Sequence, residues 1–89
     1  MKHLNITVTG LVQGVYFRVS TRDEARRLGI RGFARNMADG SVYIEAEGDD
    51  EMISVFLDWL AQGPPAARVT DVVAEEGKYC DFAGFEVRY

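Results

Sequence analysis

A stretch of the chain with the residue types of an anion-binding site spans positions 10–18, where an expected strand passes through a loop into an expected helix. The first backbone N–H groups of a helix are unpaired, and the helix dipole favours a negative charge beside them. Arg18 lies in the first expected turn, where the same dipole mildly disfavours a cation unless an anion neutralises it. Because an arginine donates two parallel hydrogen bonds to a phosphate, the junction predicts an anion site. A solvated arginine on a helix surface is the alternative interpretation.

The glycines of this junction do not form a phosphate-binding P-loop, since Gly10 and Gly14 have the wrong spacing and no lysine follows them. Gly14 instead suits a turn that needs a positive φ, or a close approach of the backbone to a ligand. We therefore expect its conformation, rather than a motif, to shape the loop.

Most other catalytic arrangements are absent from the sequence. It contains no Gly-x-Ser-x-Gly elbow for a nucleophilic serine. A single cysteine, Cys80, excludes an internal disulfide and a multi-cysteine metal cluster, and a single histidine, His3, excludes a histidine pair. We expect Cys80 to be a structural or incidental thiol and His3 to be a partly exposed side chain at the start of a strand. The sequence thus predicts no metal site and no cofactor.

The charge of the chain is unevenly distributed. The 89 residues carry a net charge of −4, which argues against nucleic-acid binding because such binding needs a basic face. Residues 1–40 hold seven Lys or Arg against three acids, whereas residues 41–89 hold three against eleven. A small anionic ligand would be attracted to the first half. No apolar run approaches 20 residues and the N-terminus lacks the apolar core of a signal peptide, so we expect a cytoplasmic protein without a membrane anchor.

Hydrophobic periodicity and turn signals predict the elements that position the junction. Residues 3–12, 30–36, 41–47 and 67–75 are expected to form strands, with a short last strand over 85–89. Residues 17–28 form an expected helix that Gly29 ends, and a second helix runs from an Asp49 N-cap to Gly63. In the strand over 41–47, alternation places Val42, Ile44 and Ala46 inward and Tyr43, Glu45 and Glu47 outward. The order predicts a single α+β domain over residues 1–89, a ferredoxin-like βαββαβ sandwich with two helices on one face of an antiparallel sheet.

Four segments of the sequence resemble the acylphosphatase family, in order and over essentially the whole chain. They are Gly10-Leu11-Val12-Gln13-Gly14-Val15-Tyr16-Phe17-Arg18, the segment from Gly32 to Val42, the segment from Gly63 to Val69, and Phe85-Glu86-Val87-Arg88-Tyr89. The first segment is long and unusual, so chance agreement is improbable. The resemblance implies the same ferredoxin-like fold and the hydrolysis of acyl phosphates to a carboxylate and inorganic phosphate.

The resemblance also implies roles for particular residues. Arg18 matches the phosphate-binding arginine of the family, and Asn36 matches its water-orienting asparagine. The backbone of five residues matches the phosphate cradle of the family: Gln13, Gly14, Val15, Tyr16 and Phe17. Asn36 has a second interpretation as a turn-favouring residue, because Asn bonds its own backbone and tolerates the left-handed conformation.

Two other function classes remain open at this stage. One is a module that binds phosphate or carbamoyl phosphate without turnover. The other is an RNA-binding domain, since Arg31-Gly32-Phe33-Ala34 resembles the start of an RNA-binding signature. Arg35 breaks that signature where an aromatic residue belongs, and the segment lies in the wrong strand. We therefore expect a monomer that acts on a small-molecule acyl phosphate, with neither nucleic acid nor membrane as a partner.

Overall fold

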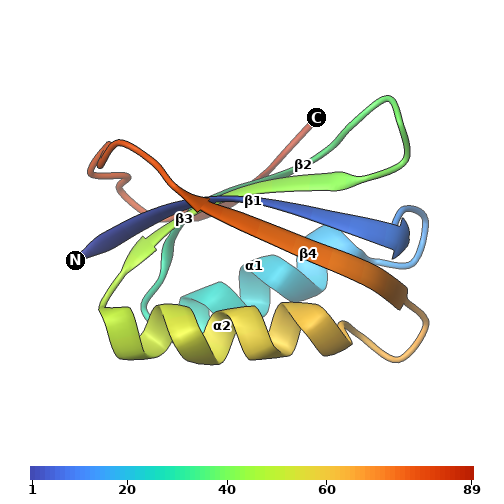
Figure 1. The fold of residues 1–89 in the computed structure, drawn as a ribbon, viewed down its shortest axis with the longest axis horizontal. Helices are drawn as coiled ribbons and strands as arrows, with labels where there is room; N and C mark the ends of the chain where they lie inside the picture. Colours follow the sequence, from blue (N-terminus) through green and yellow to red (C-terminus); the bar gives the residue numbers. More distant parts are fainter.

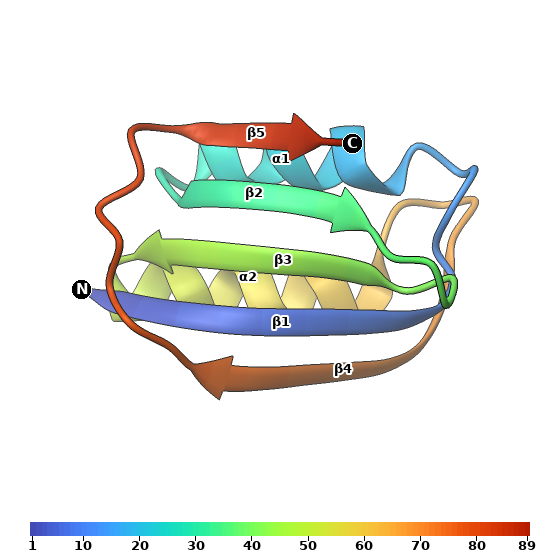
Figure 2. The same ribbon diagram turned by 90° about the horizontal axis from the view of Figure 1, so that it is seen from above.

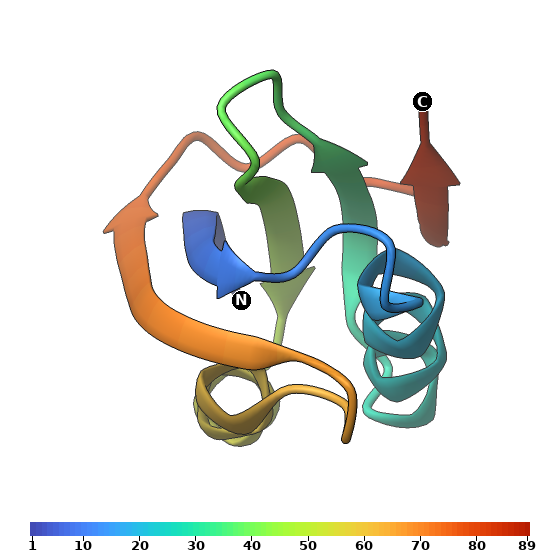
Figure 3. The ribbon, with the colours of Figure 1, turned by 90° about the vertical axis from the view of Figure 1, so that its right-hand side faces the viewer.

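The computed structural model describes residues 1–89 and contains each of the expected elements, with bounds within one residue of those predicted. They are β1 (Lys2–Leu11), α1 (Phe17–Arg27), β2 (Arg31–Asn36), β3 (Val42–Gly48), α2 (Asp50–Gln62), β4 (Arg68–Glu76) and β5 (Phe85–Arg88). Both helices lie on one face of the sheet, as Figures 1 and 3 show, which confirms the ferredoxin-like α+β fold. Neither helix has the length and apolar character that crossing a bilayer requires.

The sheet has the order β4-β1-β3-β2-β5. It is mixed, whereas the sequence predicted a wholly antiparallel sheet. Only the pair of β2 with β5 is parallel. The chain leaves β4 at one edge and crosses the sheet through residues 77–84, called the strap below, to reach the opposite edge (Figure 2). Since β5 returns in the direction opposite to β4, it runs parallel to β2.

The core lies between the helices and the sheet and follows the predicted periodicities. In β1 and β3, alternate residues are buried, and each helix buries residues three or four positions apart. The fully enclosed side chains from these elements include Ile6, Val8, Phe17, Val42, Ile44, Ile53, Phe56 and Leu60. Trp59 packs on Phe17, with 6.2 Å between ring centroids, so it is a packing residue.

Gly29 and Asp49 mark the end of α1 and the beginning of α2. Gly29 has φ +70° just after α1, which confirms it as the stop signal. Asp49 is the N-cap of α2 as predicted, but its side chain makes no capping hydrogen bond. The dipole of α2 is complemented instead by Asp50 and Glu51 in the first turn.

Two expectations about the outer face of the sheet were wrong. His3, expected to be partly exposed, is 5% exposed, and Glu47, expected to face solvent, is 0% exposed. The strap covers both residues, because the Glu47 carboxylate accepts hydrogen bonds from the backbone N–H groups of Cys80 and Phe82. His3 Nδ1 lies 2.7 Å from the same carboxylate. Burial alone would raise the pKa of Glu47, but the hydrogen bonds from Cys80, His3 and Phe82 keep it below its usual range.

Candidate active site

The loop between β1 and α1 makes a sharp turn through two left-handed residues. Gly14 has φ +74°, which confirms the predicted positive φ, and Tyr16 has φ +61° as the N-cap of α1. A positive φ is uncommon for a residue with a side chain, and no pattern in the sequence indicated it at Tyr16. A Cβ at Gly14 would meet no atom within 4 Å, so only the backbone conformation requires glycine there.

The N-terminus of α1 offers free hydrogen-bond donors to this loop. No side chain caps the helix, and its first turn contains no acidic residue. The first N–H groups of the helix therefore lack a partner from the protein, and the helix dipole adds partial positive charge. This is the arrangement that binds phosphate and carboxylate groups.

The side chain of Gln13 fastens the loop to the turn between β2 and β3. Its Nε2 donates to the carbonyl oxygens of Met37 at 2.8 Å and Ser41 at 2.9 Å. The same turn is braced by Asp39, whose pKa lies below its usual value because the Ser41 hydroxyl donates to its carboxylate at 2.6 Å. Sequence reasoning used only the backbone of Gln13 and missed this side-chain role.

Arg18 projects from the first turn of α1 and is held by the C-terminus. Its Nη1 donates to the carbonyl oxygen of Arg88 at 2.8 Å, and its guanidinium carbon lies 4.7 Å from the centroid of the Tyr89 ring. The end of the chain lies beside the start of α1 in Figure 2. One guanidinium donor is used in this way, so the others remain for a ligand.

Asn36 reaches the same place through the register of the sheet. Asn36 pairs with Val42, and Val42 pairs with Val8, so the three residues share one row across β2, β3 and β1. Paired residues point to the same face, and both valines are buried under the helices. The amide of Asn36 is therefore directed toward the helix side, and its Oδ1 is enclosed without a hydrogen-bond partner.

A pocket of about 330 Å³ brings these predicted residues together. It is lined by Val12, Gly14, Tyr16, Phe17, Arg18, Val19 and Asn36. Two members of the predicted cradle do not line it, since Gln13 turns to the β2–β3 connection and Val15 packs against the core. The arrangement combines an arginine, a helix N-terminus and an unpaired amide, which can bind a phosphoryl group and orient a water molecule.

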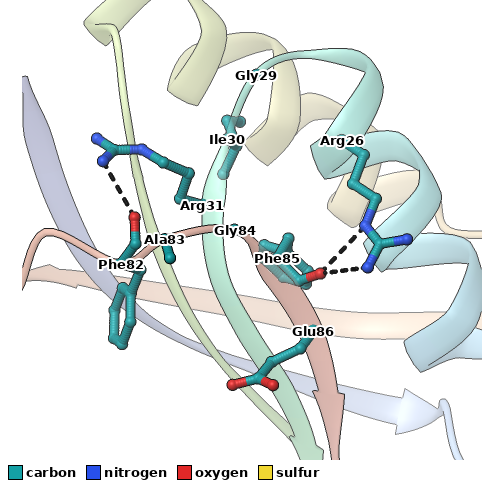
Figure 4. A pocket seen from close by; sticks show the side chains of 9 residues that line it. All are labelled: Arg26, Gly29, Ile30, Arg31, Phe82, Ala83, Gly84, Phe85 and Glu86. Atoms are coloured by element: carbon teal, nitrogen blue, oxygen red, sulfur yellow. Dashed lines mark hydrogen bonds between the residues drawn. The ribbon is translucent and has the colours of Figure 1, made fainter.

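A larger pocket of about 490 Å³ lies at the other end of α1, between Arg26, Arg31 and the segment 82–86 (Figure 4). Its two arginines are already engaged with the main chain. Arg26 donates to the carbonyl oxygen of Phe85 at 2.9 and 3.2 Å, and Arg31 donates to that of Phe82 at 3.1 Å. These bonds fasten the strap and β5, so the smaller pocket is the candidate site.

The chain is similar to known proteins over nearly its whole length. The family model for acylphosphatase matches residues 4–87. The chain is 49% identical over 89 residues to an acylphosphatase of Thermotoga maritima, covering 100% of this chain and 99% of that protein. It is 51% identical over 86 residues to an acylphosphatase of an Anaeromyxobacter species, covering 96% of this chain and 92% of that protein. The crystal structure of acylphosphatase from Bacillus subtilis superposes with a TM-score of 0.95 at 33% identity, covering 100% of both chains. The chain belongs to the acylphosphatase family.

Proposed function

We propose that this protein hydrolyses the carboxyl-phosphate anhydride bond of acyl phosphates in the pocket between α1 and the end of β2. The observation that carries the proposal is that Arg18 and Asn36, from different elements, line one pocket at a helix N-terminus. Membership of the acylphosphatase family supports the reaction itself.

In this proposal the phosphoryl group of the substrate binds to Arg18 and to backbone N–H groups of the segment 13–17, of which Gly14, Tyr16 and Phe17 line the pocket. The free donors of the guanidinium and the uncapped first turn of α1 supply positive potential on the same side of the pocket. Donors held in place before the reaction stabilise charge as it develops on the phosphoryl oxygens. The carbonyl oxygen of Arg88 positions Arg18 for this contact.

Asn36 orients the attacking water in line with the scissile bond. The water oxygen forms a bond to phosphorus while the bond from phosphorus to the carboxyl oxygen breaks, and the carboxylate leaves. No Asp, Glu or His lines the pocket, so the water proton passes to a phosphoryl oxygen. An acyl phosphate is already activated, so orientation rather than a strong base or a covalent nucleophile is the main requirement.

The acting unit in this proposal is one copy of the domain over residues 1–89, with a small-molecule substrate and no cofactor. A monomeric state, a cytoplasmic location and the absence of nucleic-acid binding remain predictions. A module that binds phosphate or carbamoyl phosphate without turnover is not favoured, because relatives of nearly the same length are named acylphosphatases.

A hydrolysis assay with benzoyl phosphate and purified protein, with a chelator present, tests the proposal. We expect release of benzoate, with competitive inhibition by inorganic phosphate. Phosphate binding in calorimetry without any hydrolysis would favour the binding module. The absence of both phosphate binding and hydrolysis would reject the pocket as a phosphate site.

A further inference from the structure

The only histidine and the only cysteine of the chain meet on the face of the sheet that the helices leave uncovered. His3 lies at the start of β1, and Cys80 lies in the strap near the other end of the sequence. Glu45 of β3 joins them, so that the imidazole, carboxylate and thiol ligand atoms all lie within 4.8 Å of one another. This cluster lies at the end of the sheet opposite the loop that joins β1 to α1 (Figure 2).

The imidazole of His3 is oriented by groups on its other sides. Its Nδ1 lies 2.7 Å from the Glu47 carboxylate, which also accepts hydrogen bonds from two backbone N–H groups of the strap. These bonds favour the ionised carboxylate, which therefore accepts the ring N–H as well. The ring stacks on Phe82 at 6.0 Å between centroids. A histidine that donates one ring N–H to a carboxylate presents its other nitrogen as a ligand, which is the usual support of metal-binding histidines.

The other ring nitrogen of His3, Nε2, faces oxygen atoms of the kind that bind metal ions. It lies 3.2 Å from Glu45 Oε1 and 2.9 Å from Asn5 Oδ1, and Cys80 Sγ completes the group. Glu45 is held in place because its other carboxylate oxygen accepts the Tyr43 hydroxyl at 2.9 Å. Two carboxylates beside a single imidazole leave an excess of negative charge that a divalent cation would offset.

We propose that His3 Nε2, Glu45 Oε1 and Cys80 Sγ bind a divalent transition-metal ion of the zinc type, with Glu47 as the residue that positions His3. Nitrogen, oxygen and thiolate sulfur together match the ligand preference of zinc and cobalt rather than that of magnesium or calcium. Tetrahedral zinc separates such ligand atoms by about 3.3–3.6 Å, given its bond lengths of about 2.0–2.3 Å. The nitrogen and the carboxylate oxygen already have nearly this spacing, and Cys80 is an exposed loop residue that can approach.

A metal ion at this cluster links the strap to β1 and β3. Its expected effect is therefore stabilisation of the fold rather than participation in hydrolysis. A proton is the competing occupant of Nε2. Burial lowers the pKa of His3, but the hydrogen bonds with Glu47 and Asn5 outweigh it and raise the pKa above its usual value. The metal titration that tests the proposal is therefore run at mildly alkaline pH, so that fewer protons compete for Nε2.

Untagged, chelator-treated protein titrated with Co²⁺ gives a direct test. We expect one ion per chain, a thiolate-to-cobalt charge-transfer absorption, its loss when Zn²⁺ displaces Co²⁺, and a higher Tm with Zn²⁺. The charge-transfer absorption identifies Cys80 as the sulfur ligand of cobalt, because Cys80 is the only thiol in the sequence.

Exposed or partly exposed ligands are the ones to substitute, because His3 variants risk misfolding. Cys80→Ser should abolish the charge-transfer absorption, and both Cys80→Ser and Glu45→Gln should weaken zinc binding about tenfold or more. Asp58→Asn, which removes the same charge from an exposed position on α2, should bind like the wild type. Absence of binding at micromolar cobalt, or wild-type zinc affinity in either ligand variant, would overturn the proposal. The occupant of Nε2 would then be a proton rather than a metal ion.

Discussion

Arg18 enters its pocket from the first turn of α1 with one donor already bonded to the carbonyl oxygen of Arg88. This contact orients a long side chain that would otherwise sample many rotamers in solvent. At the scale of single residues, the pocket thus holds one oriented cation and, in Asn36, one amide with an unpaired oxygen. The two side chains are expected to act on different parts of the reaction.

Replacing Arg18 by Ala should lower the rate of acyl phosphate hydrolysis by about 10²–10³, because a preorganised donor to a developing charge contributes that much. Phosphate inhibition should weaken in parallel, since the same group binds the ground state. Steady-state kinetics with and without inorganic phosphate measure both effects. Arg22→Ala, one helical turn further along α1, is the matched control and should leave both unchanged. Near-normal turnover of Arg18→Ala would reject the assigned role.

Asn36→Ala should lower kcat by about 10² while phosphate still inhibits, because it removes an interaction made chiefly in the transition state. Its Tm should change little, since the enclosed amide oxygen has no partner to lose. Comparison of kcat, the inhibition constant for phosphate and thermal melting separates these effects. A variant that keeps its rate and only melts earlier would support the turn-favouring interpretation instead.

At the scale of elements, the proposed active pocket depends on how the β1–α1 loop is shaped and where it is fastened. Gly14 and Tyr16 turn the chain so that the helix begins at Phe17 with its N-terminus uncapped. Gln13 then bonds this loop to the β2–β3 turn, which follows Asn36 directly. The loop and the strand that hold the two site residues are therefore joined through one side chain.

Gly14→Ala tests the backbone requirement, and Gly29→Ala offers a control with nearly the same geometry. The two glycines have φ +74° and +70°, and a Cβ at either would meet no atom within 4 Å. Each variant should lose about 1 kcal/mol of stability from the left-handed conformation, a Tm decrease of about 4–8 °C in a domain of this size. Only Gly14→Ala should also reduce hydrolysis. Equal activities in the two variants would show that the loop conformation does not serve catalysis.

Gln13→Ala should reduce kcat/KM by about tenfold, because losing the tether lets the loop move relative to Asn36, and small misplacements are costly in catalysis. Stability should fall by about 1–3 kcal/mol, since two carbonyl oxygens lose their shared donor. Denaturant unfolding and kinetics measure the two effects. Gln62→Ala at the exposed end of α2 is the control. An unchanged kcat/KM in Gln13→Ala would restrict this side chain to a structural role.

At the scale of the whole molecule, the two edge strands have different defences against pairing with another copy. β5 is short, with four residues, whereas β4 is long and carries Asp71, Glu75 and Glu76. Charges on an edge strand disfavour strand addition between copies. The net charge of −4 adds repulsion between molecules.

We therefore expect sedimentation equilibrium at micromolar concentration to give the monomer mass of 9.9 kDa. Because salt screens the charges on the strand edges, a repeat of the experiment at high salt concentration is the more demanding test, and we expect the monomer mass there as well. A mass of about twice the monomer value would contradict this prediction and would direct attention to the β4 edge.

The amino-acid sequence by itself determined the elements, and its resemblance to the acylphosphatase family indicated the candidate site residues. Alternating apolar residues, helical stripes and the helix stop at Gly29 are local signals, because they act through neighbours close in the chain. The positive φ at Gly14 and the position of Arg18 in the first turn of α1 are local in the same sense, and both were predicted.

Only the tertiary structure decided which of these residues meet, and what covers each face of the sheet. Asn36 reaches the pocket through the pairing register of β2, β3 and β1, which the spacing of residues within one strand does not specify. Alternation correctly placed Glu47 on the face away from the helices, yet the side chain is buried because the strap crosses there. Periodicity reports the direction of a side chain relative to its own strand. Burial depends on a segment about thirty residues later in the chain, and that contact exists only once the sheet has formed.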